Sequence, residues 1–417
     1  MKGQDLIRFH GHRKAGDWPT ALPGGAQAIA VGDWIQWVRL VQGVNESRDL
    51  PVRPFSIKTF PNATLCDNIL VEKAENPRGE ENELAKIWIR QAVLRALDDA
   101  MAEDPTVIVM GEDVAAAGGP FKVTEGLLAR HGPDRVIDTP ISEMAFLGAG
   151  VGAAVCGMKP VVEMMFIEFI GVALDELTTQ AATMRYLSRG KLTVPLVVRA
   201  SAGGGQGFGC QHSQMLDHWF RGTPGLKLCV TSSARTTYGL LRSAIDDPDP
   251  VVVLEPRVLY SEREEYEFDT SYRIPLGQAE IVKPGKDATV VTCGAMVRVA
   301  NEAAARTEAN IEVIDLLTLW PWDRKTVTAS VARTGRLVTV EEATMGSGWG
   351  ADVASAIVSD QFGSLKAPPL RITLPDAPAP YSGVLEARYL PNPDYVVAQI
   401  NALVSTNKIP APWWESA

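Results

Sequence analysis

The sequence predicts an α/β protein with two doubly wound, largely parallel sheet domains that follow an N-terminal extension. From residue 84 onward, short apolar runs alternate with segments of helical length, and a charged, aromatic stretch at 262–275 interrupts this alternation once. Such alternation is typical of a parallel sheet covered by helices on both faces. We therefore expect one domain at 84–262, a linker, a second domain at 276–417, and an extension at 1–83 whose role the sequence does not indicate.

The expected elements follow from the apolar runs. A helix is expected at 84–103. Strands are expected at 106–110, 135–137, 160–165, 194–199, 226–230 and 251–255 in the first domain, and at 288–293, 311–315, 336–340 and 370–373 in the second. The extension is punctuated by prolines and predicts only one or two strands, within 28–41. About 80 residues form at best a marginal core, so we expect the extension to pack on the main body or on a partner.

Composition excludes several classes of function. The net charge is −10 and no charge run is basic, which argues against nucleic acid as a partner. The most apolar stretch, 145–174, is broken by Lys159, Glu163 and Glu168 and predicts no membrane span. The five cysteines form no C-x-x-C pair, so neither a disulfide framework nor a zinc site is expected. We expect a reducing compartment, with the bacterial cytoplasm favoured over the mitochondrial matrix.

A carboxylate stands where a strand passes directly into a helix. The junction at 138–146 reads DTPISEMAF, with Glu143 next to Ser142, a candidate helix cap, and an apolar helix of small residues after it. The side chain has two interpretations. It can complement the helix dipole as a first-turn glutamate, or it can serve a ligand from an apolar site.

Two further segments carry candidate functional residues. Phe169 ends the segment KPVVEMMFIEF at 159–169, as a core aromatic beside Phe166 or as part of a ligand site, while Glu168 is interpreted as a solvated or interface charge. His212 follows a glycine-rich loop at 203–209, either as a simple loop histidine or as a functional group. The loop departs from the G-x-G-x-x-G spacing of dinucleotide sites, so it predicts backbone flexibility rather than phosphate binding.

In this order and spacing, the four segments at 106–114, 138–146, 159–169 and 207–216 resemble the beta subunits of the thiamine-diphosphate-dependent decarboxylating component of 2-oxo acid dehydrogenase complexes. The resemblance covers roughly 85–405. It implies a transketolase-like fold, with a pyrimidine-binding domain and a transketolase C-terminal domain.

The resemblance assigns roles to three residues. Glu143 would hydrogen-bond the far nitrogen of the cofactor's aminopyrimidine ring, Phe169 would pack on that ring, and His212 would line the channel and manage protons during acyl transfer. Burial raises the pKa of a carboxyl group and strengthens its hydrogen bonds, so an apolar environment would suit Glu143.

The resemblance also implies a weaker site for a monovalent cation such as K⁺. Its positions are Leu196, Ala244, Asp247 and Asp249. Relatives hold the ion largely through backbone carbonyls, and oxygen ligands suit such a hard ion. Asp249 stands where relatives usually have asparagine, and the segment also reads as a plain turn that ends a helix.

A missing motif predicts the partners. Enzymes of this class anchor the diphosphate through Mg²⁺ held by a Gly-Asp-Gly motif, which this sequence lacks. We therefore expect an alpha subunit to hold the diphosphate and Mg²⁺ in an α2β2 heterotetramer, with a lipoyl acyltransferase core as a second partner.

Oxidative decarboxylation of pyruvate with acetylation of a lipoyl domain is the first expected activity, with acetoin or branched 2-oxo acids as alternatives. A non-catalytic assembly subunit is the rival from another class.

Overall fold

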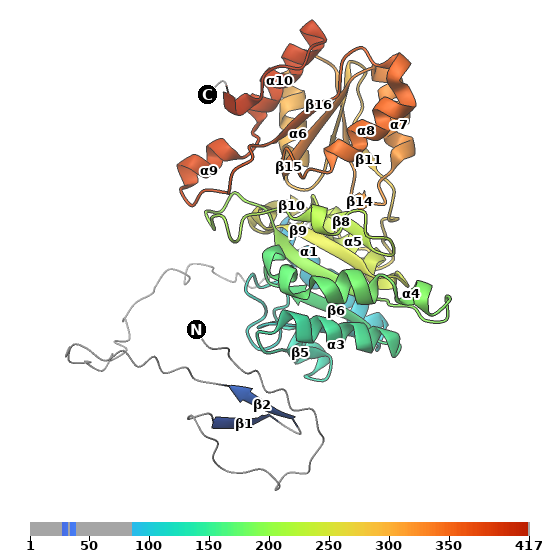
Figure 1. Ribbon diagram of the computed structural model, residues 1–417, viewed down its shortest axis with the longest axis vertical. Helices are drawn as coiled ribbons and strands as arrows, with labels where there is room; N and C mark the ends of the chain where they lie inside the picture. Colours follow the sequence, from blue (N-terminus) through green and yellow to red (C-terminus); the bar gives the residue numbers. More distant parts are fainter. Residues whose placement is uncertain (1–26, 32–33, 39–85, 416–417) are drawn as a thin grey trace, which may run out of the picture. The chain divides into compact units, whose positions relative to one another are not determined.

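The computed structural model describes residues 27–31, 34–38 and 86–415, and the chain divides into two compact units, Met1–Gly79 and Glu80–Ala417. In the first unit, β1 (Gln27–Val31) and β2 (Trp34–Val38) form an antiparallel pair. The rest of the expected extension lies outside the described residues. The second unit contains both expected sheet domains (Figure 1).

The first domain is built on a seven-stranded sheet. In spatial order its strands are β14 (Thr318–Trp320), β8 (Lys227–Val230), β9 (Val251–Pro256), β7 (Val197–Ala202), β6 (Lys159–Met164), β4 (Val107–Gly111) and β5 (Val136–Asp138). All neighbours are parallel except the edge strand β14, which runs antiparallel to β8. The sequence did not predict β14, a three-residue strand contributed from beyond the linker.

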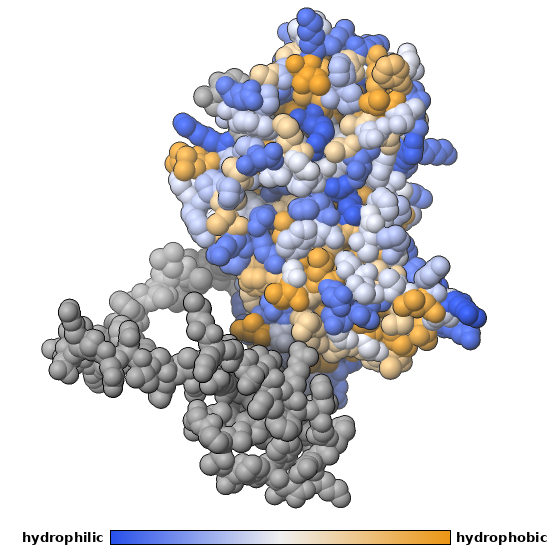
Figure 2. Space-filling view, viewed as in Figure 1, coloured by the Kyte–Doolittle hydropathy of each residue, from blue (hydrophilic) through white to orange (hydrophobic). Residues whose placement is uncertain are grey.

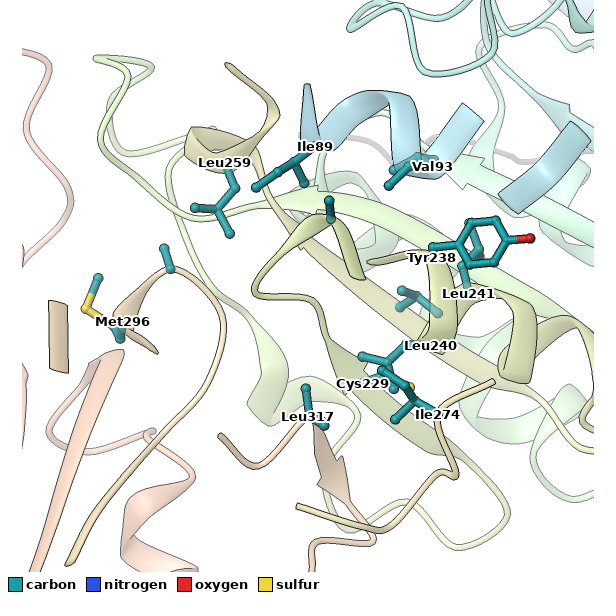
Figure 3. Close-up of a cluster of buried hydrophobic side chains, with 14 of the residues drawn as sticks. Ile89, Val93, Cys229, Tyr238, Leu240, Leu241, Leu259, Ile274, Met296 and Leu317 are labelled. Carbon is teal, nitrogen blue, oxygen red and sulfur yellow. The ribbon is translucent and has the colours of Figure 1, made fainter. Parts of the chain in front are cut away.

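Helices cover both faces of this sheet. The helices and single turns are α1 (Ile89–Glu103), α2 (Leu127–His131), α3 (Glu143–Val155), η1 (Ile167–Ala173), η2 (Glu176–Ala181), α4 (Met184–Leu187), η3 (Asp217–Trp219), α5 (Ala234–Asp246) and η4 (Arg257–Ser261). One core contains the buried faces of α1 and α5, including Val93, Tyr238 and Leu241 (Figure 3). A second core contains α3 and η1 with the opposite face of the sheet. Burial on both faces explains why these strands read as unbroken apolar runs.

The second domain repeats this plan on a smaller sheet. Its strands, in spatial order, are β11 (Glu280–Lys283), β13 (Ile311–Asp315), β12 (Ala288–Thr292), β15 (Leu337–Thr344) and β16 (Leu370–Leu374). Only the edge strand β11 is antiparallel. Its helices and turns are α6 (Met296–Arg306), α7 (Arg324–Thr334), α8 (Gly350–Gln361), η5 (Phe362–Ser364), α9 (Gly383–Tyr389), α10 (Pro393–Thr406) and η6 (Trp413–Glu415). The predicted fold class is therefore confirmed for both domains.

The segment between the domains contains one short strand. β10 (Arg263–Glu265) pairs with β3 (Lys86–Trp88), which precedes α1. The helix expected from residue 84 therefore begins only at Ile89. The linker is tied to the start of the first domain.

Candidate active site

The candidate residues lie at the carboxyl edge of the seven-stranded sheet. Parallel strands end at the same edge, and open α/β sheets bind ligands outside that edge. Glu112 follows β4, Phe169 lies in η1 after β6, His212 follows β7, and Arg257 follows β9. These four strands are adjacent in the order β4, β6, β7, β9.

Glu143 is the first residue of α3, as the sequence predicted. Ser142 occupies the cap position, but its side chain makes no capping hydrogen bond. The Glu143 side chain is partly exposed rather than buried, and its neighbours Ile141 and Met144 are also exposed. The apolar enclosure expected around this carboxylate is therefore not supplied by the described part of this chain.

A second carboxylate, Glu112, lies close enough to Glu143 for their charges to interact. Burial raises the pKa of Glu112, and the charges of Glu143 and Asp113 raise it further. Its Oε1 atom is buried without a hydrogen-bond partner among the described residues. The sequence analysis assigned this residue no role. The available signal was a carboxylate immediately after a fully apolar strand.

Phe169 and His212 are brought together. Their ring centroids lie 5.5 Å apart in an edge-to-face arrangement. Phe166 stacks on the His212 ring at 4.6 Å and meets Phe169 at 5.4 Å, while Phe208 lies 5.9 Å from Phe166. Phe169 therefore packs against Phe166, and it also lies beside His212, while its place in a ligand site stays a prediction.

Two carboxylates from the second domain hold the glycine-rich loop that leads to His212. Gly204 N donates to Glu342 Oε1 at 2.5 Å, and Gly205 N and Gly207 N donate to the two oxygens of Glu386 at 2.9 and 2.8 Å. Gly203, Gly205, Gly207 and Gly209 all have positive φ, which favours glycine. The glycines thus allow a left-handed backbone that is anchored by these bonds, not the flexibility suggested by the sequence.

Arg257 joins the two ends of this loop. Its Nη2 atom donates to the backbone oxygens of Gly203, at 2.9 Å, and of His212. The guanidinium lies 4.8 Å from the Phe166 ring and 4.6 Å from the Phe208 ring. Burial lowers the pKa of Arg257, while Glu168 and other anionic groups oppose that shift. Sequence reasoning missed this arginine, because nothing in its local pattern distinguishes a buried arginine from a surface one.

Of the two interpretations of Glu168, a solvated or an interface charge, the structure does not support the first. It is half-buried, and its Oε1 atom accepts a hydrogen bond from Gln214 N at 2.8 Å. Burial raises its pKa, while the hydrogen bond from Gln214 and the charges of Arg257 and His212 act in the opposite direction. Glu168 therefore belongs to the surroundings of His212.

The positions expected to hold K⁺ lie near two basic side chains. Both carboxylate oxygens of Asp247 accept from Lys227 Nζ at 2.6 Å, and Asp249 forms an ion pair with Arg185. The carbonyls of Leu196 and Ala244 accept backbone hydrogen bonds from Val251 and Asp247. The chain's own cations thus balance the two carboxylates, and the bound K⁺ stays a prediction.

The described residues contain neither a cluster of metal ligands nor a helix that could cross a membrane. No group of three or more histidine, cysteine, aspartate or glutamate side chains with the arrangement of a metal site occurs among them. No helix in the same part of the chain is long and apolar enough to cross a membrane.

Comparison with known proteins defines the class of fold first. Residues 85–262 match the transketolase pyrimidine-binding domain, and residues 277–396 match the transketolase C-terminal domain. A solved structure described as a split-gene transketolase, inactive beta4 tetramer, superposes with a TM-score of 0.63 at 24% identity, covering 77% of this chain and 99% of that chain. At that identity the likeness shows the fold alone.

Closer relatives define the family. The mitochondrial pyruvate dehydrogenase E1 component subunit beta-1 of Arabidopsis thaliana is 44% identical over 318 residues, covering 75% of this chain and 88% of that protein. The acetoin:2,6-dichlorophenolindophenol oxidoreductase subunit beta of Cupriavidus necator is 43% identical over 326 residues, covering 75% and 96%. The chain belongs to this family of thiamine-diphosphate-dependent 2-oxo acid dehydrogenase (E1) beta subunits, oxidoreductase components that work with an alpha subunit in multienzyme complexes.

Proposed function

We propose that this chain is the catalytic beta subunit of an α2β2 enzyme that cleaves a small carbonyl substrate and transfers the resulting acyl group to a lipoyl domain. The observation that carries the proposal is the meeting of Phe169 and His212 at the carboxyl edge of a pyrimidine-binding domain. Pyruvate is the first substrate to test, and acetoin is the second because a relative bearing that name is 43% identical. The location proposed is the bacterial cytoplasm.

The residues present fit the pyrimidine end of thiamine diphosphate. Glu143 would hold the far ring nitrogen and Phe169 would pack on the ring. Polar atoms of Glu112 and Glu168 are buried there without a partner among the described residues, as expected where a polar group completes a site. When bound, the cofactor supplies a carbon that adds to a carbonyl and accepts an electron pair. Mg²⁺ and the diphosphate would be held by the alpha subunit.

His212 would act after the carbon–carbon bond is cleaved. Phe166 stacks on its ring, and Arg257 donates a hydrogen bond to its backbone carbonyl. A histidine positioned in this way can give or take a proton as the acyl group passes to a lipoyl sulfur. The lipoyl acyltransferase is the proposed second partner.

A binding experiment tests the division of labour between the subunits. Because the chain lacks the diphosphate anchor, the isolated protein should not bind thiamine diphosphate tightly in calorimetry even with Mg²⁺. The mixture with its alpha subunit should bind the cofactor and reduce a dye with pyruvate or acetoin. Saturable micromolar binding by the isolated chain would overturn this assignment, and so would a mixture that binds the cofactor but turns over no carbonyl substrate.

A further inference from the structure

One carboxylate oxygen at the candidate active site lacks a hydrogen-bond partner. Glu168 Oε1 accepts from Gln214 N at 2.8 Å, but Oε2 is buried and has no partner among the described residues. A buried acceptor without a partner destabilises the folded state. Since Oε1 already fixes the backbone next to His212, the structural role of Glu168 is fulfilled and Oε2 is available for a donor.

The groups around Glu168 limit what this donor can be. The charged or titratable groups that interact with it are Arg257 and His212. Arg257 is 1% exposed; its Nη2 atom donates to two backbone carbonyls and its Nη1 atom to Ser201 Oγ, while its Nε atom is buried without a partner among the described residues. His212 Nδ1 is also buried without a partner in the described part of the chain. A ligand would therefore meet a carboxylate and an imidazole beside Phe169.

These groups distinguish the two substrate classes of the proposed function. A 2-oxo acid is an anion with no hydroxyl donor, so its carboxylate would meet Glu168 as a like charge, which is unfavourable in a buried site. An α-hydroxy ketone is neutral and carries one O–H donor. It can satisfy Glu168 Oε2 without bringing a second negative charge.

We propose that Glu168 is a further catalytic residue, which accepts the hydroxyl proton of an α-hydroxy ketone and so selects this class over 2-oxo acids. The proposal rests on the proposed function and chooses between its substrates. The sequence alone ranked pyruvate first and kept acetoin as an alternative.

The two substrate classes need different chemistry at this position. A 2-oxo acid loses CO₂ and has no hydroxyl proton to give up. In an α-hydroxy ketone, the O–H bond breaks, its proton passes to Glu168, and its electron pair forms the carbonyl of a leaving aldehyde. The bond between the carbinol and carbonyl carbons breaks, and its electron pair passes to the acyl carbon, which bound thiamine diphosphate stabilises. Those two electrons later reduce the lipoyl disulfide, or the dye in an assay, and Glu168 returns its proton to water.

The pH dependence of this step has a definite sign. Only the ionised carboxylate can take the proton. Burial raises the pKa of Glu168 above its ordinary value, opposed by the Gln214 hydrogen bond, Arg257 and His212. Cleavage of the hydroxy ketone should therefore fall as pH drops through this raised pKa, and pyruvate turnover should lack that limb.

The test uses the complete complex with its alpha subunit and compares Glu168→Gln with Asp175→Asn. Glutamine keeps an oxygen that can accept from Gln214 N but cannot act as the base. Asp175 is an exposed carboxylate seven residues further along, so its variant is the matched control. Glu168→Gln should lower the ratio of kcat/KM for acetoin to kcat/KM for pyruvate by about 10²-fold, as expected for loss of a general base. Asp175→Asn should leave that ratio unchanged.

A second measurement does not depend on turnover. Acetoin and butanone, which lacks the hydroxyl, are titrated by NMR into the cofactor-free complex. The parent should bind acetoin more tightly than butanone, and Glu168→Gln should reduce that preference by about fivefold or more, since one hydrogen bond to a charged group is lost.

The outcomes separate this proposal from the proposed function. Turnover of pyruvate but not acetoin by the parent complex, or equal losses for both substrates in Glu168→Gln, would overturn the role of Glu168 and leave the family function intact. A complex that binds thiamine diphosphate but reacts with neither substrate would overturn the proposed function itself. A lower acetoin-to-pyruvate ratio, together with loss of the acidic limb and of the acetoin preference, would establish the proposal.

Discussion

The carboxyl edge of the first sheet has two halves that differ in how complete they are. The half after β7 and β9 contains the glycine-rich loop, His212 and Arg257, and the second domain closes it through Glu342 and Glu386. The half after β4 and β5 contains Glu112 and Glu143, where Ile141 is 85% and Met144 57% exposed. The first half is built by this chain, whereas the second exposes apolar side chains that another surface is needed to cover.

Exposed apolar residues are not confined to this region. Figure 2 shows hydrophobic residues on the surface of the lower, first domain on the face in view. Val172, Tyr186 and Leu187 in the same domain are 66%, 86% and 71% exposed. Such exposure marks surfaces that bind other proteins, as expected in a family that works with an alpha subunit.

The largest expected effect lies in the open half. Glu143→Gln keeps the shape of the side chain and removes its charge, so turnover by the complex with the alpha subunit should fall by about 10²-fold or more, the range for lost proton-transfer chemistry. Folding should change little, because the side chain is partly exposed and makes no helix cap. Dye reduction and thermal unfolding measure the two effects.

Glu125→Gln provides the control, because Glu125 is exposed in the same domain. Near-normal turnover by Glu143→Gln would reduce Glu143 to a residue that complements the helix dipole. The open half would then be an assembly surface rather than part of the active site.

The sequence predicted some features of these two halves of the sheet edge and missed others. It found the strands on which both halves rest, because strands buried on both faces are continuously apolar. It also predicted Phe169 and His212 as site residues, through segments that resemble a family, and the structure brings their two rings together. It missed Arg257, which lies against Phe166 and Phe208, residues far from it in the sequence. It also did not predict the hydrogen bond from Gln214 N to Glu168, which joins residues 46 apart.

The sequence likewise did not predict which residues hold the glycine-rich loop in place. Its anchors, Glu342 and Glu386, lie 138 and 181 residues from the glycines that they bind. A glutamate in a strand or a short helix carries no local sign of such a distant partner. The same holds for β14, whose pairing with β8 depends on how the second domain is placed against the first.

An intermediate effect is expected in the closed half. His212→Ala should impair lipoyl acylation by about tenfold beyond its effect on dye-coupled turnover, because the dye bypasses the transfer step at which this histidine is proposed to act. The two assays are run on the same complex, with His131→Ala as the control, because His131 ends α2 and its ring bonds to Asp98. Equal losses in both assays would assign His212 to carbon–carbon cleavage or to the shape of the pocket.

The smallest expected effect is on the stability of the folded protein. It tests the contact between the two domains that Glu342 makes with Gly204. Burial raises the pKa of Glu342 from 4.5 to about 7, and the charge of Glu386 raises it while Gly204 N and Arg257 lower it. A folded-state pKa above the unfolded value means that the folded protein holds its proton more tightly. The stabilisation is therefore complete below about pH 4.5 and is lost as pH rises through about 7.

Glu342→Gln removes this titration while keeping an oxygen that can accept from Gly204 N. The parent should lose stability relative to this variant between about pH 5 and 8, by roughly 2–3 kcal/mol. Asp217 and Asp315 also have pKa values near 7, but they occur in both proteins, so the difference between the two denaturant midpoints reports Glu342 alone. Glu308→Gln, at an exposed position, should show the parent's pH dependence. If Glu342→Gln also kept that dependence, Glu342 would be ionised throughout this range. Gly204 N would then donate its hydrogen bond to a carboxylate whose charge does not change between these pH values.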